Sequence, residues 1–434
     1  MYILLNWLNS DGTIGLGYFR ELKNLSFAPQ VDLTGNSLPA SEYSVDVVMP
    51  EGLPGELTHA VLYDEIGQEW CEWPPRKVQR ITGNYYRLTC TSRLLMLDDV
   101  ELEPKMYTGE DAEAVIDECF YATTSRYTVA EALQSVPING FCPAQTARER
   151  LTWVLFVIGA YADDTFTEQI EIKAVDESAT LIPYDRTFAR PTVDRRDWVT
   201  GLSLTTYTFH EGTEAEWQSD DNSYMFPTPW IATPQTFTLA NPAAPSDARE
   251  NIITFDSLYL ITPSNVSAIA ARLAKYWFNP TEASLDCVNN RQYKPGDLVQ
   301  AYTDTDRMAM GYVQQMNSRF GKQSRATLKL IGATEVECAR LTVRYTYENG
   351  IIGQAKYTLP VGYAYSVTNP YLEKTKSKRR RVYRPQDSAI TGTLPSGGAT
   401  VTQPYDIALE YYKNQLTVYS VDGIAKQDDT GVIQ

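Results

Sequence analysis

The sequence predicts a mainly β protein with α+β insertions, and three observations lead to that fold class. Apolar and polar residues alternate, as in half-buried strands, within residues 1–106 and again within 198–331. Helical periodicity is concentrated between these stretches, and residues 332–434 return to strand patterns. The chain has 434 residues, the length of about three average domains. We therefore expect a β domain at 1–106, a helix-containing connecting domain at 107–197, a second β domain at 198–331 and a β-rich C-terminal domain at 332–434.

The first β domain shows strand signals from its start. The segment MYILLNWLNS lacks the basic residues and the cleavage site of a signal peptide and is typical of a strand. Gly83-Asn84 lies between two strand-like runs and predicts a hairpin, with Val78–Ile81 before it and Tyr86, Leu88 and Cys90 alternating after it. A further strand is expected at 60–63, turning back toward Trp70. Gly15-Leu16-Gly17 lacks the third glycine of a dinucleotide-binding loop, and we interpret it as a hairpin turn.

The connecting domain contains three predicted helices. Ala112, Val115, Ile116, Cys119 and Phe120 have the spacing of one helix face. Each helix is expected to begin at a threonine followed three residues later by an acid, a capping-box pattern. The three pairs are Thr108 with Asp111, Thr128 with Glu131 and Thr146 with Glu149. The third helix continues through LTWVLFVIGAYA, which is apolar on nearly every side and is expected to be buried, and a strand follows at 170–174.

The second β domain begins with the alternation of Leu202 and Leu204. Residues 210–230 are polar and proline-rich, and we expect a long loop there. Thr262-Pro263 predicts the start of a helix at 263–279, since proline suits the first helical position. Further strands are expected at 285–288, 298–302, 311–316 and 326–330.

A faint internal repeat links the two β domains. Val78-Gln79 precedes the strand of Leu88, and Val313-Gln314 precedes the strand of Leu328. Each hairpin also follows another predicted strand. Because any two hairpins share such a pattern, the sequence leaves the existence of a true repeat open.

The C-terminal domain is predicted to consist of hairpins around one basic loop. Asn349-Gly350 is the strongest hairpin signal of the chain, and a last strand pair is expected around Lys413-Asn414. Between them, residues 371–385 carry a net charge of +6. The basic residues, our candidates for partner binding, are Lys374, Lys376, Lys378, Arg379, Arg380, Arg381 and Arg384. A solvated loop, docking on an acidic partner and contact with phosphate all remain open.

Charge and residue counts exclude several classes of function. The net charge is −16, and subtracting the +6 of the basic loop leaves −22 on the other 419 residues, which disfavours nucleic-acid binding by the body. No run of apolar residues is long enough for a membrane span. The chain has only two histidines, His59 and His210, and it has no GxSxG or P-loop motif. It therefore offers few residues for a catalytic triad, a cofactor site or a histidine metal site. We expect no enzyme, no metal and no cofactor. We interpret Asp304-Thr-Asp306 as a turn and the six cysteines as buried thiols.

Four stretches resemble the central hub protein of phage tails and related contractile injection machines. The first runs from YSVDVV at Tyr43 through VLYDEIGQEW and VQRITGNYYRLTCTS to LLMLDDVELEPKMYTGEDAEAVI. The others are GFCPAQTARERLTWVLFVIGAYADDTFTEQIEI, RDWVTGLSLTTYTF and YKPGDLVQAYTDTDRMAMGYVQQMNSRFGKQSRATLKLIG. Together they cover most of residues 40–331.

The resemblance implies two tail-tube-like β-barrels per chain and a homotrimer that presents six barrels around a channel. It implies a structural role in the virion, at the tail tip or baseplate, with assembly in the bacterial host cytoplasm. The implied partners are the distal tail or tail tube protein, the tape measure protein and a tip spike or fibre protein. DNA would pass without specific binding, along a wall that we expect to be acidic.

A β-rich carbohydrate-binding or receptor-binding protein is the alternative function. The chain has 29 tyrosines and 8 tryptophans, which could stack on sugars. The same residues could instead fill barrel surfaces and subunit interfaces.

Overall fold

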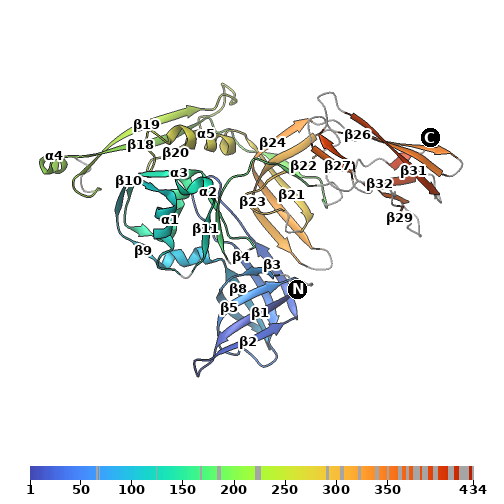
Figure 1. Ribbon diagram of the computed structural model, residues 1–434, viewed down its shortest axis with the longest axis horizontal. Coiled ribbons are helices and arrows are strands. Elements are labelled where there is room, and N and C mark those ends of the chain that lie inside the picture. Colours follow the sequence, from blue (N-terminus) through green and yellow to red (C-terminus); the bar gives the residue numbers. More distant parts are fainter. Residues whose placement is uncertain are drawn as a thin grey trace.

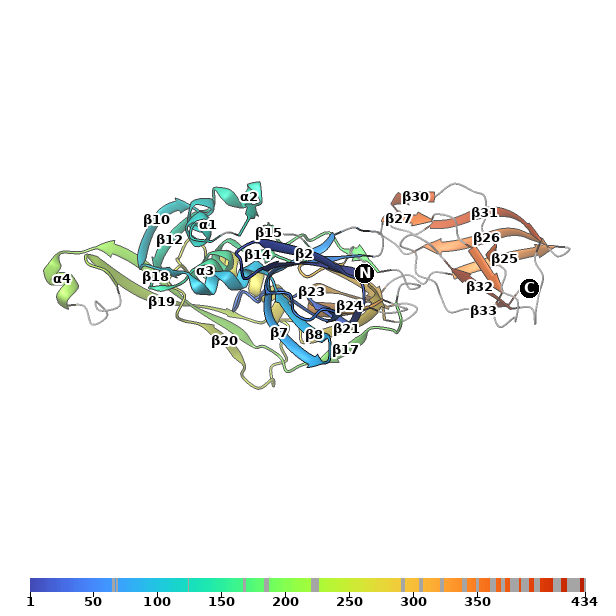
Figure 2. The same ribbon diagram turned by 90° about the horizontal axis from the view of Figure 1, so that it is seen from below.

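A computed structural model describes residues 1–337 apart from 65–66, 68, 124, 167–168, 183–186, 220–225, 290–292, 304–306 and 321–323. Beyond residue 337 it describes only separate strands between Thr342 and Val432. The fold is mainly β with a helix-containing part, as predicted. Figure 1 shows the N-terminal strands at the bottom, the helices beside them and a long two-stranded arm that ends in a small helix; Figure 2 gives the view from below.

The N-terminal strands form a four-stranded sheet of order β2-β1-β5-β6. Its strands are β1 (Tyr2–Leu8), β2 (Ile14–Phe19), β5 (Glu56–Tyr63) and β6 (Glu69–Glu72). The expected N-terminal strand is therefore confirmed. The interpretation of Gly15 and Gly17 as a turn is wrong, because both lie inside β2. A Cβ atom at either position would overlap or crowd the indole of Trp7, so glycine makes room for that side chain.

The largest sheet runs through both predicted β domains. Eight of its strands follow one another in the order β17-β21-β24-β23-β3-β4-β8-β7, every pair antiparallel, and β22 and β16 lie off this path. These strands are β3 (Leu22–Ala28), β4 (Glu42–Val48), β7 (Pro75–Thr82), β8 (Tyr85–Thr91), β16 (Thr180–Leu181), β17 (Thr192–Arg195), β21 (Thr281–Val288), β22 (Leu298–Tyr302), β23 (Arg307–Arg319) and β24 (Arg325–Glu337). The hairpin at Gly83-Asn84 and the four strands expected after residue 285 are confirmed. In the described part the sheets stay open, so the two expected barrels are joined pieces of sheet.

The faint repeat is present in the topology. We call β3, β4, β8 and β7 the first repeat, and β17, β21, β24 and β23 the second repeat. Within each, the strands lie in the same spatial order and follow the same chain order, with β5 and β22 inserted at equivalent points. One hydrophobic core passes beneath both repeats and the N-terminal sheet.

The helix-containing part packs three helices against short strands. The helices are α1 (Ala112–Phe120), α2 (Glu131–Gln134) and α3 (Ala147–Ile158), after the 3-10 helix η1 (Arg93–Asp99). The strands are β9 (Glu101–Leu102), β10 (Lys105–Asp111), β11 (Tyr127–Val129), β12 (Pro137–Cys142), β13 (Gln145–Thr146), β14 (Ala160–Asp163) and β15 (Ile170–Ala174). Apolar faces of α1 and α3 meet in a second core.

Only one of the three predicted capping boxes forms. Thr146 accepts a hydrogen bond from the backbone N–H of Glu149 at 3.2 Å, and Glu149 accepts one from the Thr146 N–H at 2.9 Å. The other two predictions are wrong, because Thr108 and Thr128 lie inside β10 and β11, where their backbones pair with other strands. The helix expected to run through Ala162 ends at Ile158, since Gly159 adopts a left-handed conformation with φ of 74°.

A long hairpin arm and a fifth helix complete the described body. β18 (Gly201–Glu211) pairs along its length with β19 (Trp230–Ala240), and β20 (Ile252–Phe255) adds a parallel strand. The expected loop at 210–230 contains α4 (Glu214–Ser219). Helix α5 (Val266–Trp277) begins three residues later than predicted, since residues 263–265 form a turn before it. It packs on Leu202, Leu204 and Phe255.

Beyond residue 341 the structure describes strands and their pairing. β25 (Thr342–Glu348) pairs with β26 (Ile351–Leu359), as Asn349-Gly350 predicted. β26 also pairs with β31 (Ala399–Ala408), and β27 (Ala364–Val367) pairs with β30 (Ile390–Thr393). The expected last hairpin is wrong, because β32 (Gln415–Tyr419) pairs with β28 (Tyr371–Lys374) and β33 (Thr430–Val432). β29 (Val382–Tyr383) pairs with β28.

The capping box of α3 gives a test of the fold. Thr146→Ala leaves the backbone N–H of Glu149 without its side-chain acceptor, and it should lower the free energy of unfolding by about 1 kcal/mol. Thr152→Ala on the same helix is the control, since the Thr152 hydroxyl only donates to the Arg148 carbonyl within the helix. Urea unfolding followed by circular dichroism compares the two. Equal midpoints for both variants would show that the box contributes nothing.

Candidate functional site

The predicted partner-binding residues lie mostly outside the described residues. Lys374 is the last residue of β28. Lys376, Lys378, Arg379, Arg380, Arg381 and Arg384 fall among residues 375–381 and 384–389, which the structure does not describe. The described ends of this segment are not a plain loop, since Leu372 pairs with Tyr383 and Glu373 with Val382.

The two histidines lie on different sheets. His59 on β5 contacts Glu72 on β6, whereas His210 stands near the end of β18. Five of the cysteines are buried free thiols, as expected, and burial raises the pKa of Cys90, Cys142 and Cys287 to about 12. Within the described residues, no group of three or more histidine, cysteine or carboxylate side chains could hold a metal ion. No described helix is long and apolar enough to cross a membrane. Asp304 and Asp306 lie outside the described residues.

The tryptophans do not present a stacking surface. All eight lie in the described part of the chain, and each is buried or half-buried. Trp73 stacks on Phe27 and Tyr43 inside the main core, with ring centroids 5.3 and 5.6 Å away. Trp73 therefore has a packing role in the main core.

The two repeats meet head to tail at a narrow junction. The last strand of the second repeat, β23, pairs with the first strand of the first repeat, β3, through Ser318 with Phe27 and Arg319 with Ser26. Backbone hydrogen bonds of 2.9 and 3.0 Å continue the contact beyond β3, from Val31 to Gln314 and from Met316 to Pro29. On the core side, Trp70 of β6 meets Phe320 edge-on at 5.3 Å.

The junction uses one edge of each repeat and leaves the opposite edges open. In the described sheet β7 ends the first repeat and β17 ends the second, each without a further strand. Residues 76–82 of β7 are exposed on both faces, and Val78 has an exposed fraction of 37%. Edge strands of this kind are templates for pairing with another chain.

Cross-strand register identifies which residues of the repeats correspond. Leu88 pairs with Val78 and Val45, and Leu328 pairs with Met316 and Leu285. Continuing along each sheet, Tyr43 pairs with Phe27, and Ala283 pairs with Val193.

Val78 therefore corresponds to Met316, and Val193 corresponds to Phe27. Met316 and Phe27 are buried at the junction, at 1% and 0% exposure. Val78 is exposed and Val193 only half-buried at the open edges. The open edges thus carry apolar residues equivalent to those that the internal junction buries.

The face of the large sheet opposite its core is polar and carries both signs of charge. Its acids come from both repeats, and so do its bases. The acids include Glu42, Asp46, Glu282 and Asp286, and the bases include Arg87, Arg319, Arg325 and Lys329. Arg87 donates two hydrogen bonds to Asp46, of 2.7 and 2.9 Å, and lowers the pKa of that carboxyl group.

The N-terminal sheet exposes a stripe of apolar side chains on β2. Ile14, Leu16 and Tyr18 point to the same side of the strand and have exposed fractions of 73, 56 and 62%. Leu8, paired with Ile14 on the neighbouring strand, adds to the stripe at 42%. Exposed apolar surface of this continuity marks interaction sites.

Buried ionic groups lie where the three parts of the chain meet. The Asp163 carboxylate accepts hydrogen bonds from Lys173, at 2.9 Å, and from Lys294 of the second repeat. Burial alone would raise the pKa of Asp163, but the two ammonium groups outweigh it and lower that pKa. The neighbouring Asp164 accepts bonds from the N–H and the hydroxyl of Ser41, in the loop between β3 and β4.

Sequence reasoning missed these surfaces, although one signal pointed toward them. The Val78-Gln79 and Val313-Gln314 similarity located the equivalent strands, but periodicity does not show which strand ends a sheet. The contacts of Asp163 with Lys294 and of Asp164 with Ser41 join residues over a hundred positions apart, and no spacing rule brings such residues together.

Comparison with known proteins shows a shared fold. No protein-family model matches the chain, and no curated protein matches its sequence. A prophage tail protein from Listeria monocytogenes is similar in structure at 10% identity, with a TM-score of 0.50, over 76% of this chain and 94% of that one. A tail protein from Neisseria meningitidis is similar at 10% identity, with a TM-score of 0.51, over 76% of this chain and 96% of that one. The chain shares the fold of these tail proteins, which confirms the predicted resemblance at the level of fold.

The buried Asp164 carboxyl gives a pH-dependent prediction. Burial raises its pKa from 3.8 to about 6, despite the bonds from Ser41. The raised pKa means that protonation favours the folded state, so this contribution is full below pH 3.8 and is lost as pH rises through 6. Relative to Asp164→Asn, the wild-type free energy of unfolding should therefore fall by up to about 3 kcal/mol between pH 4 and pH 8.

Urea midpoints measured across this pH range test the prediction. Asp247→Asn, at an exposed loop position, is the control and should follow the wild type throughout. Parallel curves for Asp164→Asn and the wild type would contradict it.

Proposed function

We propose that the chain is a structural hub subunit of a phage tail or tail-like particle. Three copies form a ring around a central channel, which joins the tail tube to the tip or spike and allows DNA to pass. The shared fold with tail proteins supports the class of function. The head-to-tail junction of the two repeats is the observation that carries the proposal of a ring.

The junction supports a ring because it is a heterologous contact. β23 pairs with β3, two non-equivalent edges, and the chain leaves another pair of the same kind open at β7 and β17. A head-to-tail contact that repeats between copies generates a closed ring when the rotation closes. Pairing of β7 with β17 of a second copy would bury Val78 and Val193 as Met316 and Phe27 are buried now.

The number three comes from the resemblance to the hub family. Two repeats per chain and three chains give six units, which match a six-fold tube. In that ring the polar face of the sheet would form the channel wall. Since Arg87, Arg319, Arg325 and Lys329 lie among the acids of this face, the proposed wall is of mixed charge and not solely acidic.

Partner contacts are proposed for two surfaces. The apolar stripe of Leu8, Ile14, Leu16 and Tyr18 suits a neighbouring tail component, such as a distal tail or tube protein. The basic segment 371–385 suits an acidic surface of another tip component, such as a spike or fibre protein. The tape measure protein would lie in the channel.

Cysteine cross-linking tests the ring. The internal pairing of Arg319 with Ser26 predicts that Thr82 of one copy faces Thr192 of the next, since these residues correspond through the register. Residues opposite each other in antiparallel strands have Cα atoms about 4.5–5.5 Å apart, within the range of a disulfide. Oxidised Thr82→Cys/Thr192→Cys protein should run on a denaturing gel in steps that stop at three times the chain mass.

The single variants Thr82→Cys and Thr192→Cys are the controls and should stay monomeric on the same gel. The five described native cysteines are buried and leave the background low. Mass measurement of the native protein accompanies the gel. A monomer in solution with no cross-linked product would overturn the proposal of a ring. A ladder of products that continues past three chains would overturn the proposed number of three copies.

The basic segment is tested in assembled particles. Arg379→Gln/Arg380→Gln/Arg381→Gln should reduce the yield of complete particles without changing the mass of the isolated ring, because the charge attracts a different chain. The lysine variants at the same positions keep the charge and should restore most of the yield. Counting particles by electron microscopy at several salt concentrations measures the effect, which should shrink as salt rises. An unchanged yield with the glutamine variants would remove this role.

A further inference from the structure

The strand β2 ends the N-terminal sheet and lacks the features by which proteins block the addition of a further strand. Figure 1 shows it at the outer side of the N-terminal strands, and in the described part of the chain no strand pairs with its second edge. From Ile14 to Phe19 it has no charged residue and no proline, and its register with β1 is unbroken. Charges, prolines and bulges are common devices that close such an edge. The edge of β2 is therefore open to another strand.

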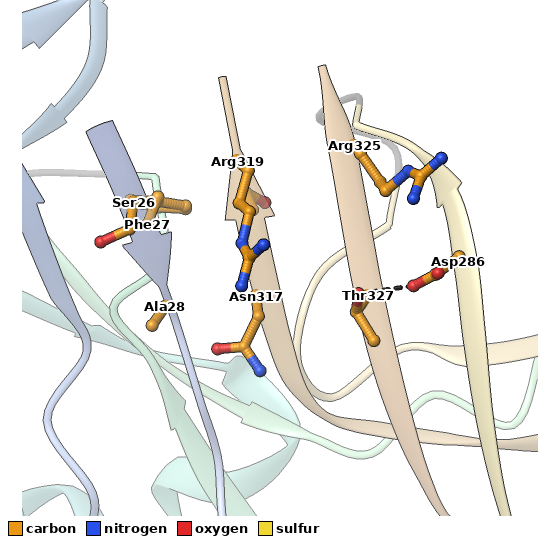
Figure 3. A pocket seen from close by; sticks show the side chains of 9 residues that line it. Ser26, Phe27, Ala28, Asp286, Asn317, Arg319, Arg325 and Thr327 are labelled. Carbon is orange, nitrogen blue, oxygen red and sulfur yellow. Dashed lines mark hydrogen bonds between the residues drawn. The ribbon is translucent and has the colours of Figure 1, made fainter. Parts of the chain in front are cut away.

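The opposite end of the same sheet does show these devices. β6 has only four residues, two of them Glu69 and Glu72, and its pairing with β5 shifts between Leu62 and Tyr63. The junction of the two repeats offers no open edge either, because β3 and β23 pair there and lie side by side in Figure 3, at a hollow of about 420 Å³. β2 differs from both by the regular and uncharged edge that it leaves open.

Apolar groups line both faces of this edge. On the outward face the apolar stripe supplies three side chains of β2, with exposed fractions from 56 to 73%. On the core face Gly15 and Gly17 carry no side chains, and the half-buried indole of Trp7 lies against them. Phe19 continues the core face and is also half-buried. A strand added here would cover apolar surface with both of its own faces.

We propose that an extended segment of a partner chain pairs with β2 as a further antiparallel strand. In strand addition, main-chain hydrogen bonds supply the affinity and alternate side chains supply the specificity. Every second residue of the segment would lie beside the apolar stripe, and the residues between would lie on the side of Trp7. The segment is therefore apolar or β-branched, and uncharged over the six residues that face β2. The antiparallel direction continues the sheet, in which every described pair is antiparallel.

Charge determines what suits the end of this segment. The Asp11 carboxylate accepts hydrogen bonds of 2.9 and 2.6 Å from the N–H and the hydroxyl of Thr13, which hold it before β2 and lower its pKa. Glu56, an exposed residue of β5, adds a second acid at the same end of the sheet. At the other end the exposed Arg20 and Glu21 balance each other. An antiparallel segment ends beside Asp11, so basic residues suit its C-terminal end.

A partner chain fits this edge better than a second copy does. Two β2 strands paired around Leu16 would place glycine opposite glycine beside Trp7, which leaves the core face without side chains. The inference rests on the partner contact proposed above for the apolar stripe, and it adds the form and the chemistry of that partner.

A fluorescein-labelled peptide of alternating valine and threonine that ends in two lysines tests the proposal on the full chain. Fluorescence anisotropy should show saturable binding. The same peptide with N-methyl groups on its central residues keeps its side chains but loses backbone donors, so it should bind at least about tenfold more weakly. With the two lysines moved to its start, the peptide should bind about threefold more weakly at low salt.

Variants of the chain locate the binding. Ile14→Thr/Leu16→Thr removes two exposed apolar side chains of β2 and should weaken binding of the peptide by about tenfold or more. Tyr121→Thr/Ile252→Thr is the matched control, because Tyr121 after α1 and Ile252 on β20 are likewise exposed, at 93 and 47%. It should change binding by less than about twofold.

Several outcomes would overturn the proposal. Equal binding of the parent and the N-methylated peptide would exclude strand addition, and equal losses in the two double variants would exclude β2 as the site. Equal binding with the lysines at either end would overturn the antiparallel direction. A mass in solution that doubles for the wild type but not for Ile14→Thr/Leu16→Thr would assign the edge to a second copy.

The yield of complete particles separates this inference from the proposed partner contact. A yield that falls in Ile14→Thr/Leu16→Thr, without binding of the peptide to the wild type, would keep the contact and overturn strand addition. An unchanged yield in this variant, together with binding of the peptide that depends on β2, would overturn the contact and support strand addition.

Discussion

The short antiparallel contact between β23 and β3 is the interaction on which the architecture depends. It converts two repeats that are far apart in the sequence into one sheet, and it sets a single core beneath both. The ladder itself covers two residue pairs, and backbone hydrogen bonds from Val31 to Gln314 and from Met316 to Pro29 extend it. Phe27, buried at this point and stacked on Trp73 and Phe166, supplies the apolar surface that makes the join stable.

The helix-containing part secures this join from the side. Asp163 binds Lys294 of the second repeat, and the adjacent Asp164 binds Ser41 of the first. Two neighbouring residues therefore contact both repeats. Arg272 of α5 donates to the Phe156 carbonyl at the end of α3, in a setting buried enough to lower its pKa to about 10. Breaking one partner of such buried pairs leaves a charge without compensation, which makes the relative placement of the parts specific.

Local signals in the sequence were sufficient for most elements. The hairpin at Gly83-Asn84, the capping box at Thr146 and the strand at Leu298–Tyr302 were all predicted, because turn chemistry and periodicity act over a few residues. Thr108 and Thr128 carried the same capping pattern as Thr146, yet their backbones pair with other strands, β12 and β15.

The glycines of β2 were misinterpreted because their cause is a side chain on another strand, Trp7. The candidate surfaces were harder still. Whether Val78 lies at an edge, or Arg319 opposite Arg325, depends on which strands pair, and one sequence does not encode that locally. The hub resemblance anticipated the fold, whereas the residues that form its surfaces came only from the register.

If the β23–β3 contact repeats between copies, as proposed, it has a consequence for the timing of assembly. Inside one chain the two edges are tethered, so they meet at the high effective concentration that a covalent connection provides. The equivalent edges at β7 and β17 would meet between separate copies, so their proposed pairing would depend on the concentration of the chain. One type of contact can therefore serve first as a step of folding and later as a step of polymerisation, with the supply of new subunits deciding when the second begins.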